Sequence, residues 1–155
     1  MEYHSVPLEN KYMWHAYHVA KMYYMQSRWN DRQSPVAVLV EKASGKIIHT
    51  AIAARGAHYI FEKCDRLKAH DMPYEACDLC KEYQHAEALL AKDLSSRSFK
   101  GHVVYIYGQW HCCANCEKIL KRKGVEKVFI MENAKALFSR ASATTVIGSP
   151  KQFQY

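Results

Sequence analysis

The sequence predicts an α/β protein in which helices cover both faces of a central sheet. Strand-type and helix-type segments alternate along the chain, which is the pattern of that architecture. The 155 residues suffice for one domain, and 49% apolar with 24% charged residues allow a real core. We expect a single domain over residues 1–155, with its core at about 9–147 and a tail at 148–155.

The first half of the chain predicts one helix and one β-hairpin. Residues 9–28 carry apolar side chains at helical spacing, with charged side chains elsewhere. Residues 36–40 (VAVLV) form a β-branched run, Ser44-Gly45 supplies a turn, and residues 47–52 form the returning strand. Residues 54–84 are polar, contain cysteines and predict no regular element.

The second half predicts helices and strands in turn. Helices are expected at residues 85–94, 113–123 (ended by Gly124) and 133–139. Strands are expected at residues 103–107 (VVYIY), 127–131 and 143–147.

Charge and cysteine content narrow the class of protein. The formal net charge of +7 favours an anionic partner, such as a nucleotide or a nucleic acid. The longest aliphatic run, residues 36–40, is far shorter than the ~20 residues of a membrane span, and no secretory signal begins the sequence. We therefore expect a cytoplasmic protein without membrane contact, whose six cysteines are reduced thiols or metal ligands.

Two short motifs carry the chemistry: His85-Ala86-Glu87 and Cys113-Ala114-Asn115-Cys116. Each opens a predicted helix, where the positive end of the helix dipole favours thiolates. Two cysteines and one histidine give zinc three protein ligands and leave a fourth position open, as in catalytic sites. Zinc lowers the pKa of a bound water towards ~7, and Glu87 could then move the proton of that water. H-x-E followed by C-x-x-C is the motif of zinc-dependent nucleobase deaminases.

The two motif-bearing segments, QHAEALLAK and GHVVYIYGQWHCCANCEKILKRKGVEKVFI, resemble the active-site blocks of the cytidine and deoxycytidylate deaminase superfamily. The likeness spans roughly residues 35–132, and Cys64 with the stretch 73–80 (PYEACDLC) is similar to the deoxycytidylate deaminase-like proteins of phages and bacteria. The resemblance implies a three-layer α/β/α sandwich with a five-stranded mixed sheet. It also implies that His85, Cys113 and Cys116 bind zinc, that Glu87 shuttles protons, and that the chain forms a homo-oligomer.

The chain departs from the family pattern at two places. The family usually has proline before the first cysteine of the pair, whereas this chain has Cys112, which could compete as a ligand. We favour Cys113 because Cys113 and Cys116 keep the C-x-x-C spacing. Many relatives also carry an asparagine that contacts the sugar, and the corresponding stretch here, residues 51–55 (AIAAR), has none.

A second group of cysteines predicts a structural zinc site. Cys64, Cys77 and Cys80 lie in the irregular segment before the first motif, and His70 or His58 could be the fourth ligand. A long segment without regular structure is uncommon in a compact domain unless something holds it, which favours a metal. The alternative is that these cysteines are free thiols.

The remaining predictions concern the substrate. Trp110 could stack on the base, and Arg55 and Arg66 could bind a 5′-phosphate. The basic strip, defined as Lys118, Lys121, Arg122, Lys123 and Lys127, is interpreted as a solvated helix face.

We expect hydrolysis of a free cytosine nucleotide, deoxycytidylate (dCMP) to deoxyuridylate (dUMP) and ammonia, with zinc-bound hydroxide attacking C4 and Glu87 as the proton shuttle. One alternative is a cytosine or adenine deaminase of single-stranded DNA or RNA, for which the net charge is favourable. Another is a zinc-stabilised domain that binds a nucleotide or a partner without turnover.

Overall fold

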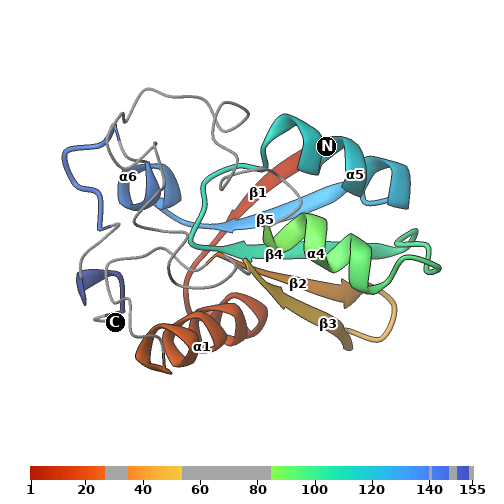
Figure 1. Cartoon of the computed structure of the whole chain (residues 1–155), viewed down its shortest axis with the longest axis horizontal. Helices are drawn as coiled ribbons and strands as arrows, with labels where there is room; N and C mark the ends of the chain where they lie inside the picture. Colours follow the sequence, from red (N-terminus) through yellow and green to blue (C-terminus); the bar gives the residue numbers. More distant parts are fainter. Residues whose placement is uncertain (27–34, 54–84, 140, 147–149, 154–155) are drawn as a thin grey trace.

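A computed structural model gives the fold and describes residues 1–26, 35–53, 85–139, 141–146 and 150–153 (Figure 1). Its strands are β1 Glu2–Val6, β2 Val36–Glu41, β3 Ile47–Ile52, β4 His102–Tyr107 and β5 Lys127–Met131. They form one five-stranded sheet in the order β1-β5-β4-β2-β3. β1, β5 and β4 are parallel, and β2 is antiparallel to both β4 and β3. The predicted five-stranded mixed sheet is confirmed.

Helices cover both faces of this sheet, as predicted. The described helices are α1 Lys11–Gln26, α4 Ala86–Asp93, α5 Ala114–Lys123, α6 Ala134–Phe138 and the 3-10 helix η4 Pro150–Phe153. Buried side chains of α4 and α5 share one apolar cluster with the sheet, and those of α1, α6 and η4 share another. None of the described helices is both long and apolar enough to cross a membrane.

The central strand β2 shows why two layers of helices are needed. Val36, Val38 and Val40 belong to the cluster under α1, while Ala37 and Leu39 belong to the cluster under α4 and α5. Successive side chains of a strand point to opposite faces, so an uninterrupted apolar run must be covered on both. The sequence VAVLV therefore dictates a buried central strand.

The sheet takes its fifth member from the N-terminal strand β1 and not from residues 143–147. The strand predicted at residues 143–147 is wrong for residues 143–146, the part that the structure describes. Ala143–Val146 lies in turns and irregular backbone. The Val146 N–H and the Thr145 hydroxyl both donate to the carbonyl of Leu137, at 2.9 and 3.2 Å. Because these groups bind the end of α6, the segment is not available to a sheet.

β1 escaped sequence-based prediction because it lacks an apolar face. Its first four residues are exposed, and the strand is joined to β5 through backbone pairing from Glu2–Lys127 to Val6–Met131. An edge strand needs only one hydrogen-bonded neighbour, so its side-chain pattern can be weak. The sheet thus begins before residue 9.

The C-terminal segment also contacts the domain. Phe153 is buried, and its carbonyl accepts a hydrogen bond from the Tyr17 hydroxyl at 3.1 Å. Its ring lies 4.7 Å from that of Tyr24. The part of residues 148–155 that the structure describes, Pro150–Phe153, therefore packs on α1.

The C-terminal ends of α4 and α5 are joined by Lys123. Its Nζ donates to the carbonyls of Leu94, Ser95 and Arg97 at 2.8, 2.6 and 3.0 Å. Leu94 is the C-cap of α4, where carbonyls lack partners within the helix, and Ser95 and Arg97 belong to the turn that follows, so the ammonium binds the cap and the turn together. Lys123 therefore fixes α5 against the end of α4 and is not part of a solvated face.

We expect Lys123→Met to lower the free energy of unfolding by about 0.5–1.5 kcal/mol, because it removes the charged donor of three carbonyls, of which the Leu94 contact is half-buried and the other two are exposed. Denaturant unfolding would measure the loss. Lys118→Met is the matched control, since the Lys118 side chain is exposed on the same helix. Equal stability of the two variants would contradict the role given to Lys123.

Candidate metal centre

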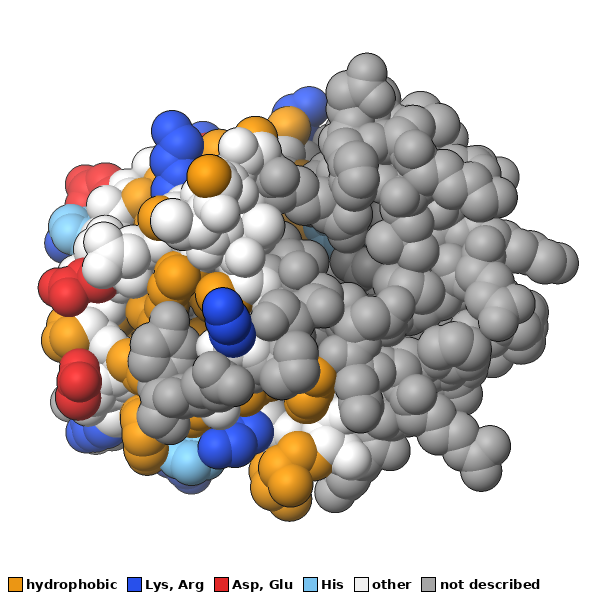
Figure 2. All heavy atoms as spheres, turned by 90° about the vertical axis from the view of Figure 1, so that its left-hand side faces the viewer, with side chains coloured by type: hydrophobic (Ala, Val, Ile, Leu, Met, Phe, Trp, Pro, Cys, Tyr) orange, Lys and Arg blue, Asp and Glu red, His pale blue; other side chains and the backbone are white. Residues whose placement is uncertain are grey.

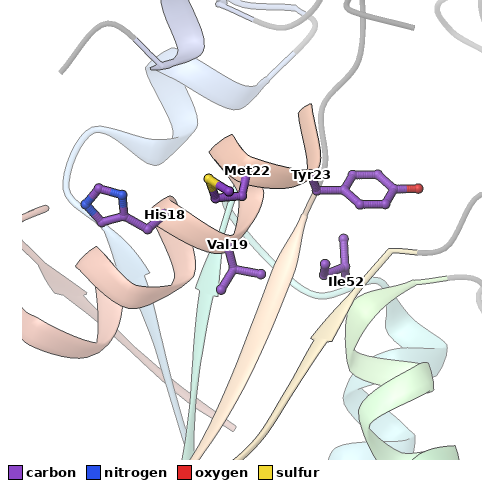
Figure 3. Close-up of a pocket in the computed structure, with 5 residues that line it drawn as sticks. All are labelled: His18, Val19, Met22, Tyr23 and Ile52. Carbon is purple, nitrogen blue, oxygen red and sulfur yellow. The ribbon is translucent and has the colours of Figure 1, made fainter. Parts of the chain in front are cut away.

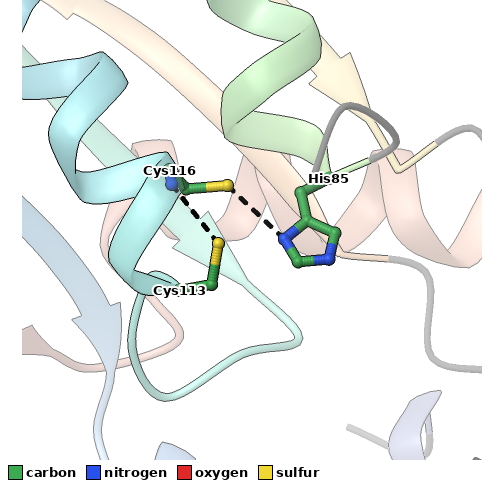
Figure 4. Close-up of side chains that lie close together, drawn as sticks. All are labelled: His85, Cys113 and Cys116. Carbon is green, nitrogen blue, oxygen red and sulfur yellow. Dashed lines mark hydrogen bonds between the residues drawn. The ribbon is translucent and has the colours of Figure 1, made fainter. Parts of the chain in front are cut away.

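Three of the predicted site residues lie at the starts of two neighbouring helices. His85 is the N-cap of α4, Cys113 is the N-cap of α5, and Cys116 follows one turn later. Both N-cap residues have extended backbone angles, which is ordinary at this position. α4 and α5 contact each other, so the three side chains converge between them (Figure 4).

The separations of the ligand atoms suit a tetrahedral metal ion. His85 Nδ1 lies 3.4 Å from Cys116 Sγ, and one donor atom from each of the three residues lies within 4.8 Å of the others. Zinc–sulfur distances of about 2.3 Å and zinc–nitrogen distances of about 2.0 Å place tetrahedral ligands roughly 3.5–3.8 Å apart. A small inward movement of the side chains would complete the coordination.

Hydrogen bonds within the group favour a thiolate at Cys113. The Cys116 thiol donates to it and, with His85 and the backbone N–H of Cys116 at 3.3 Å, holds the pKa of Cys113 well below its usual range. The same hydrogen bond, together with burial, raises the pKa of Cys116. Metal ions bind thiolates, so a cation between the two sulfurs would replace the proton of the Cys116 thiol in this hydrogen bond.

Glu87 lies in the first turn of α4 and is wholly buried. Neither of its carboxylate oxygens has a hydrogen-bond partner among the described residues. Burial raises the pKa of Glu87, whereas the nearby His85 lowers it. A buried carboxyl group without partners is costly to a fold, so its position beside a metal-ligand group indicates a chemical role.

Cys112 is also buried, but it lies outside the group of three ligand atoms. Its thiol is close enough to interact with Glu87, and burial raises the pKa of that thiol. The structure therefore brings Cys113, and not its neighbour, together with His85 and Cys116.

Of the residues predicted to bind the substrate, the structure describes Trp110. Trp110 is half-buried, 3.8 Å from the His111 ring and 5.5 Å from Lys135 Nζ (ring centroids). Arg55 and Arg66 lie outside the described residues. So do the predicted ligands of the second zinc site, which are Cys64, Cys77, Cys80, His70 and His58.

A hollow on α1 is separate from the metal centre (Figure 3). It has a volume of about 280 Å³ and is lined by His18, Val19, Met22, Tyr23 and Ile52. These residues belong to the sheet face opposite α4 and α5. The hollow therefore does not lie at the helix starts that carry His85, Cys113 and Cys116.

Sequence reasoning missed Tyr3, whose hydroxyl accepts a hydrogen bond from the N–H of Cys112 at 3.2 Å. No motif links residue 3 to residue 112, because the contact is made only once β1 joins the sheet. An N-terminal tyrosine within a weak strand pattern is the only signal that the sequence offers.

Comparisons with known proteins connect this chain with a solved structure. No protein-family model matches the chain, and no curated protein matches it in sequence. The crystal structure of a dCMP deaminase from the cyanophage S-TIM5, in complex with dCMP and dUMP, aligns with 82% of this chain and 88% of that one. The identity is 19% and the TM-score 0.43, so function has to be argued from the site itself.

We expect Cys113→Ser and Cys116→Ser each to lose one equivalent of zinc per chain, because each removes a thiolate ligand from the same ion. Metal analysis of the purified variants would measure the loss. Cys112→Ser is the matched control and should retain that zinc; loss of zinc from this variant instead would make Cys112 the ligand.

The same metal analysis tests the second zinc site. Two zinc ions per chain in the unaltered protein would support that site, and one would exclude it.

Proposed function

We propose that this chain is a zinc-dependent hydrolase that deaminates a free cytosine nucleotide. The most specific form of the proposal is conversion of dCMP and water to dUMP and ammonia. The H-x-E and C-x-x-C motifs support it, as does the convergence of His85, Cys113 and Cys116 at two helix starts.

The buried carboxyl group of Glu87 is the observation that carries the proposal. A zinc site that is only structural needs four protein ligands and no proton donor beside it. Among the described residues three ligand atoms lie together, and the neighbouring Glu87 is wholly buried with neither carboxylate oxygen partnered in that part of the chain. Such a carboxyl group is suited to proton transfer, and burial raises its pKa above the usual value of a glutamate.

The residues divide the work of the reaction. Zinc, when bound, would lower the pKa of a coordinated water so that hydroxide forms near neutral pH. His85, Cys113 and Cys116 hold the ion. Glu87 would accept one proton of the water and give it to N3 of the base as C4 is attacked. It would then accept the second proton, from the hydroxyl now on C4, and give it to the departing amine. The carboxyl group ends the cycle as it began, which satisfies the proton balance of hydrolysis.

The contacts of the basic residues favour a free nucleotide over a nucleic-acid strand as the substrate. In the basic strip, Lys121 pairs with Glu117 at 2.7 Å and Lys123 binds carbonyls of the α4 end. Figure 2 shows the face away from the C-terminal end of α5, and there the described lysine and arginine side chains lie apart from one another. A single phosphate needs only a few cations, whereas a strand needs a basic groove.

We expect Glu87→Gln to lower kcat by about 10²–10⁴-fold, because the amide cannot move protons, while zinc content stays unchanged. Ammonia release would be measured with dCMP, cytidine, deoxycytidine and a cytosine-containing oligonucleotide. Glu126→Gln, a change at an exposed position, should keep full activity.

Full activity with zinc retained in Glu87→Gln would rule out this mechanism. Release of ammonia from the oligonucleotide alone would identify the nucleic-acid deaminase. No release from any cytosine or adenine compound would leave the non-catalytic binding domain as the function.

Trp110 is the proposed stacking partner of the base, since it directly precedes the segment that carries the cysteines. We expect Trp110→Ala to raise KM several-fold and to change kcat little, because base–aromatic stacking is worth about 1–3 kcal/mol per base. Steady-state kinetics with dCMP would measure both constants. An unchanged KM would exclude the stacking role.

A further inference from the structure

We propose that Tyr3 is a positioning residue for the metal centre: its hydroxyl holds the backbone of Cys112, and thereby fixes the neighbouring ligand Cys113. The inference deepens the proposed function, because it concerns the same site. It assigns a role to the N-terminal strand, which the motifs do not include.

The contact joins two elements that are far apart in the sequence. Tyr3 lies in β1, opposite Val128 of β5, and its hydroxyl oxygen accepts the Cys112 N–H at 3.2 Å. Cys112 belongs to the loop between β4 and α5 and immediately precedes the N-cap Cys113. In Figure 1 the N-terminus lies beside α5, in agreement with this contact.

A buried backbone N–H explains why this chain needs the hydroxyl. Cys112 is only 3% exposed, and an unpaired N–H at such a position would destabilise the fold. The deaminase pattern that the sequence resembles has proline here, and proline has no N–H to satisfy. Replacing proline by Cys112 creates a donor, and Tyr3 supplies its acceptor.

Other contacts of the N-terminal segment reach the same helix. The Tyr3 hydroxyl and the N-terminal amine both lie close enough to Glu117, in the first turn of α5, to influence that carboxylate. The side chain of Met1 packs against the apolar cluster under α4 and α5. β1 therefore supports the helix start that carries both cysteines.

Such support should be measurable as metal affinity. A ligand whose backbone is held in place loses less freedom when the metal binds, and removal of groups that orient metal ligands typically costs 10–100-fold in affinity or activity. The hydroxyl of Tyr3 acts through one peptide unit, which places its effect at the lower end of that range.

The test compares two tyrosine-to-phenylalanine variants that each remove one hydroxyl. Tyr3→Phe removes the acceptor of the Cys112 N–H, and Tyr12→Phe removes a comparable hydrogen bond, 2.8 Å long, to the Gly45 carbonyl on the other side of the sheet. Release of zinc to an excess of chelator, and the visible spectrum of the cobalt(II)-substituted protein, would be recorded for both.

We expect Tyr3→Phe to release zinc about 10-fold faster and to alter the cobalt spectrum, while Tyr12→Phe leaves both unchanged. A general loss of stability would instead lower the melting temperatures of both variants, so thermal unfolding alone would not show an effect on the metal centre. Equal rates of release from the two variants would overturn the proposal.

A second variant tests the hydrogen bond itself. Cys112→Pro removes the N–H donor together with the thiol, which also interacts with the Tyr3 hydroxyl, so adding Tyr3→Phe to it should change zinc release no further; in Cys112→Ala, which keeps the N–H, Tyr3→Phe should keep its full effect. A full 10-fold effect of Tyr3→Phe in the Cys112→Pro background would overturn the proposal, because the hydroxyl would then act by another route. Should Cys112→Pro not fold, the comparison of Tyr3→Phe with Tyr12→Phe decides alone.

These measurements separate the proposal from the function on which it rests. Faster zinc release from Tyr3→Phe, in a protein that releases no ammonia from any cytosine compound, would support the positioning role and refute the deaminase. Deaminase activity together with equal rates of zinc release from the two tyrosine variants would support the deaminase and refute the positioning role.

Discussion

The structure depends on holding the first turns of two helices at one place. His85 comes from α4, and Cys113 and Cys116 come from α5, and a metal ion can join them only if the helices keep their relative position within a fraction of an ångström. Both helices pack on the same sheet face, and Lys123 binds the end of α4 from the end of α5. The apolar layer sets the approximate position of the helices, and polar contacts at their ends refine it.

The same arrangement explains how a carboxyl group can be buried without a partner in the described part of the chain. Glu87 follows His85 by two residues and is therefore carried into the interior when α4 presents its histidine to the cysteines. The free energy of burying it is offset by packing of Ala86, Ala88 and Leu90 in the surrounding cluster. A fold without a chemical use for this group would gain stability from an apolar residue at position 87.

The N-terminal strand connects the edge of the sheet to this centre. β1 lies next to β5, whose other neighbour, β4, leads into the cysteine-bearing loop. Tyr3 spans the remaining distance to Cys112. An edge strand thus reaches the loop before the candidate metal ligands through one hydrogen bond, although it contributes none of those residues and little apolar surface.

By itself, the sequence determined the local chemistry and most of the elements. The apolar run at residues 36–40 required a strand buried on both faces, and the H-x-E and C-x-x-C spacings picked out three residues whose potential ligand atoms the fold brings together. Tertiary structure alone decided the identity of the fifth strand, the role of Lys123 and the contact of Tyr3. These features rest on backbone groups, the carbonyls and N–H groups that every residue has, and their partners depend on which segments meet in space. Side-chain patterns report burial and spacing along one segment, so the sequence predicts β2 but not β1.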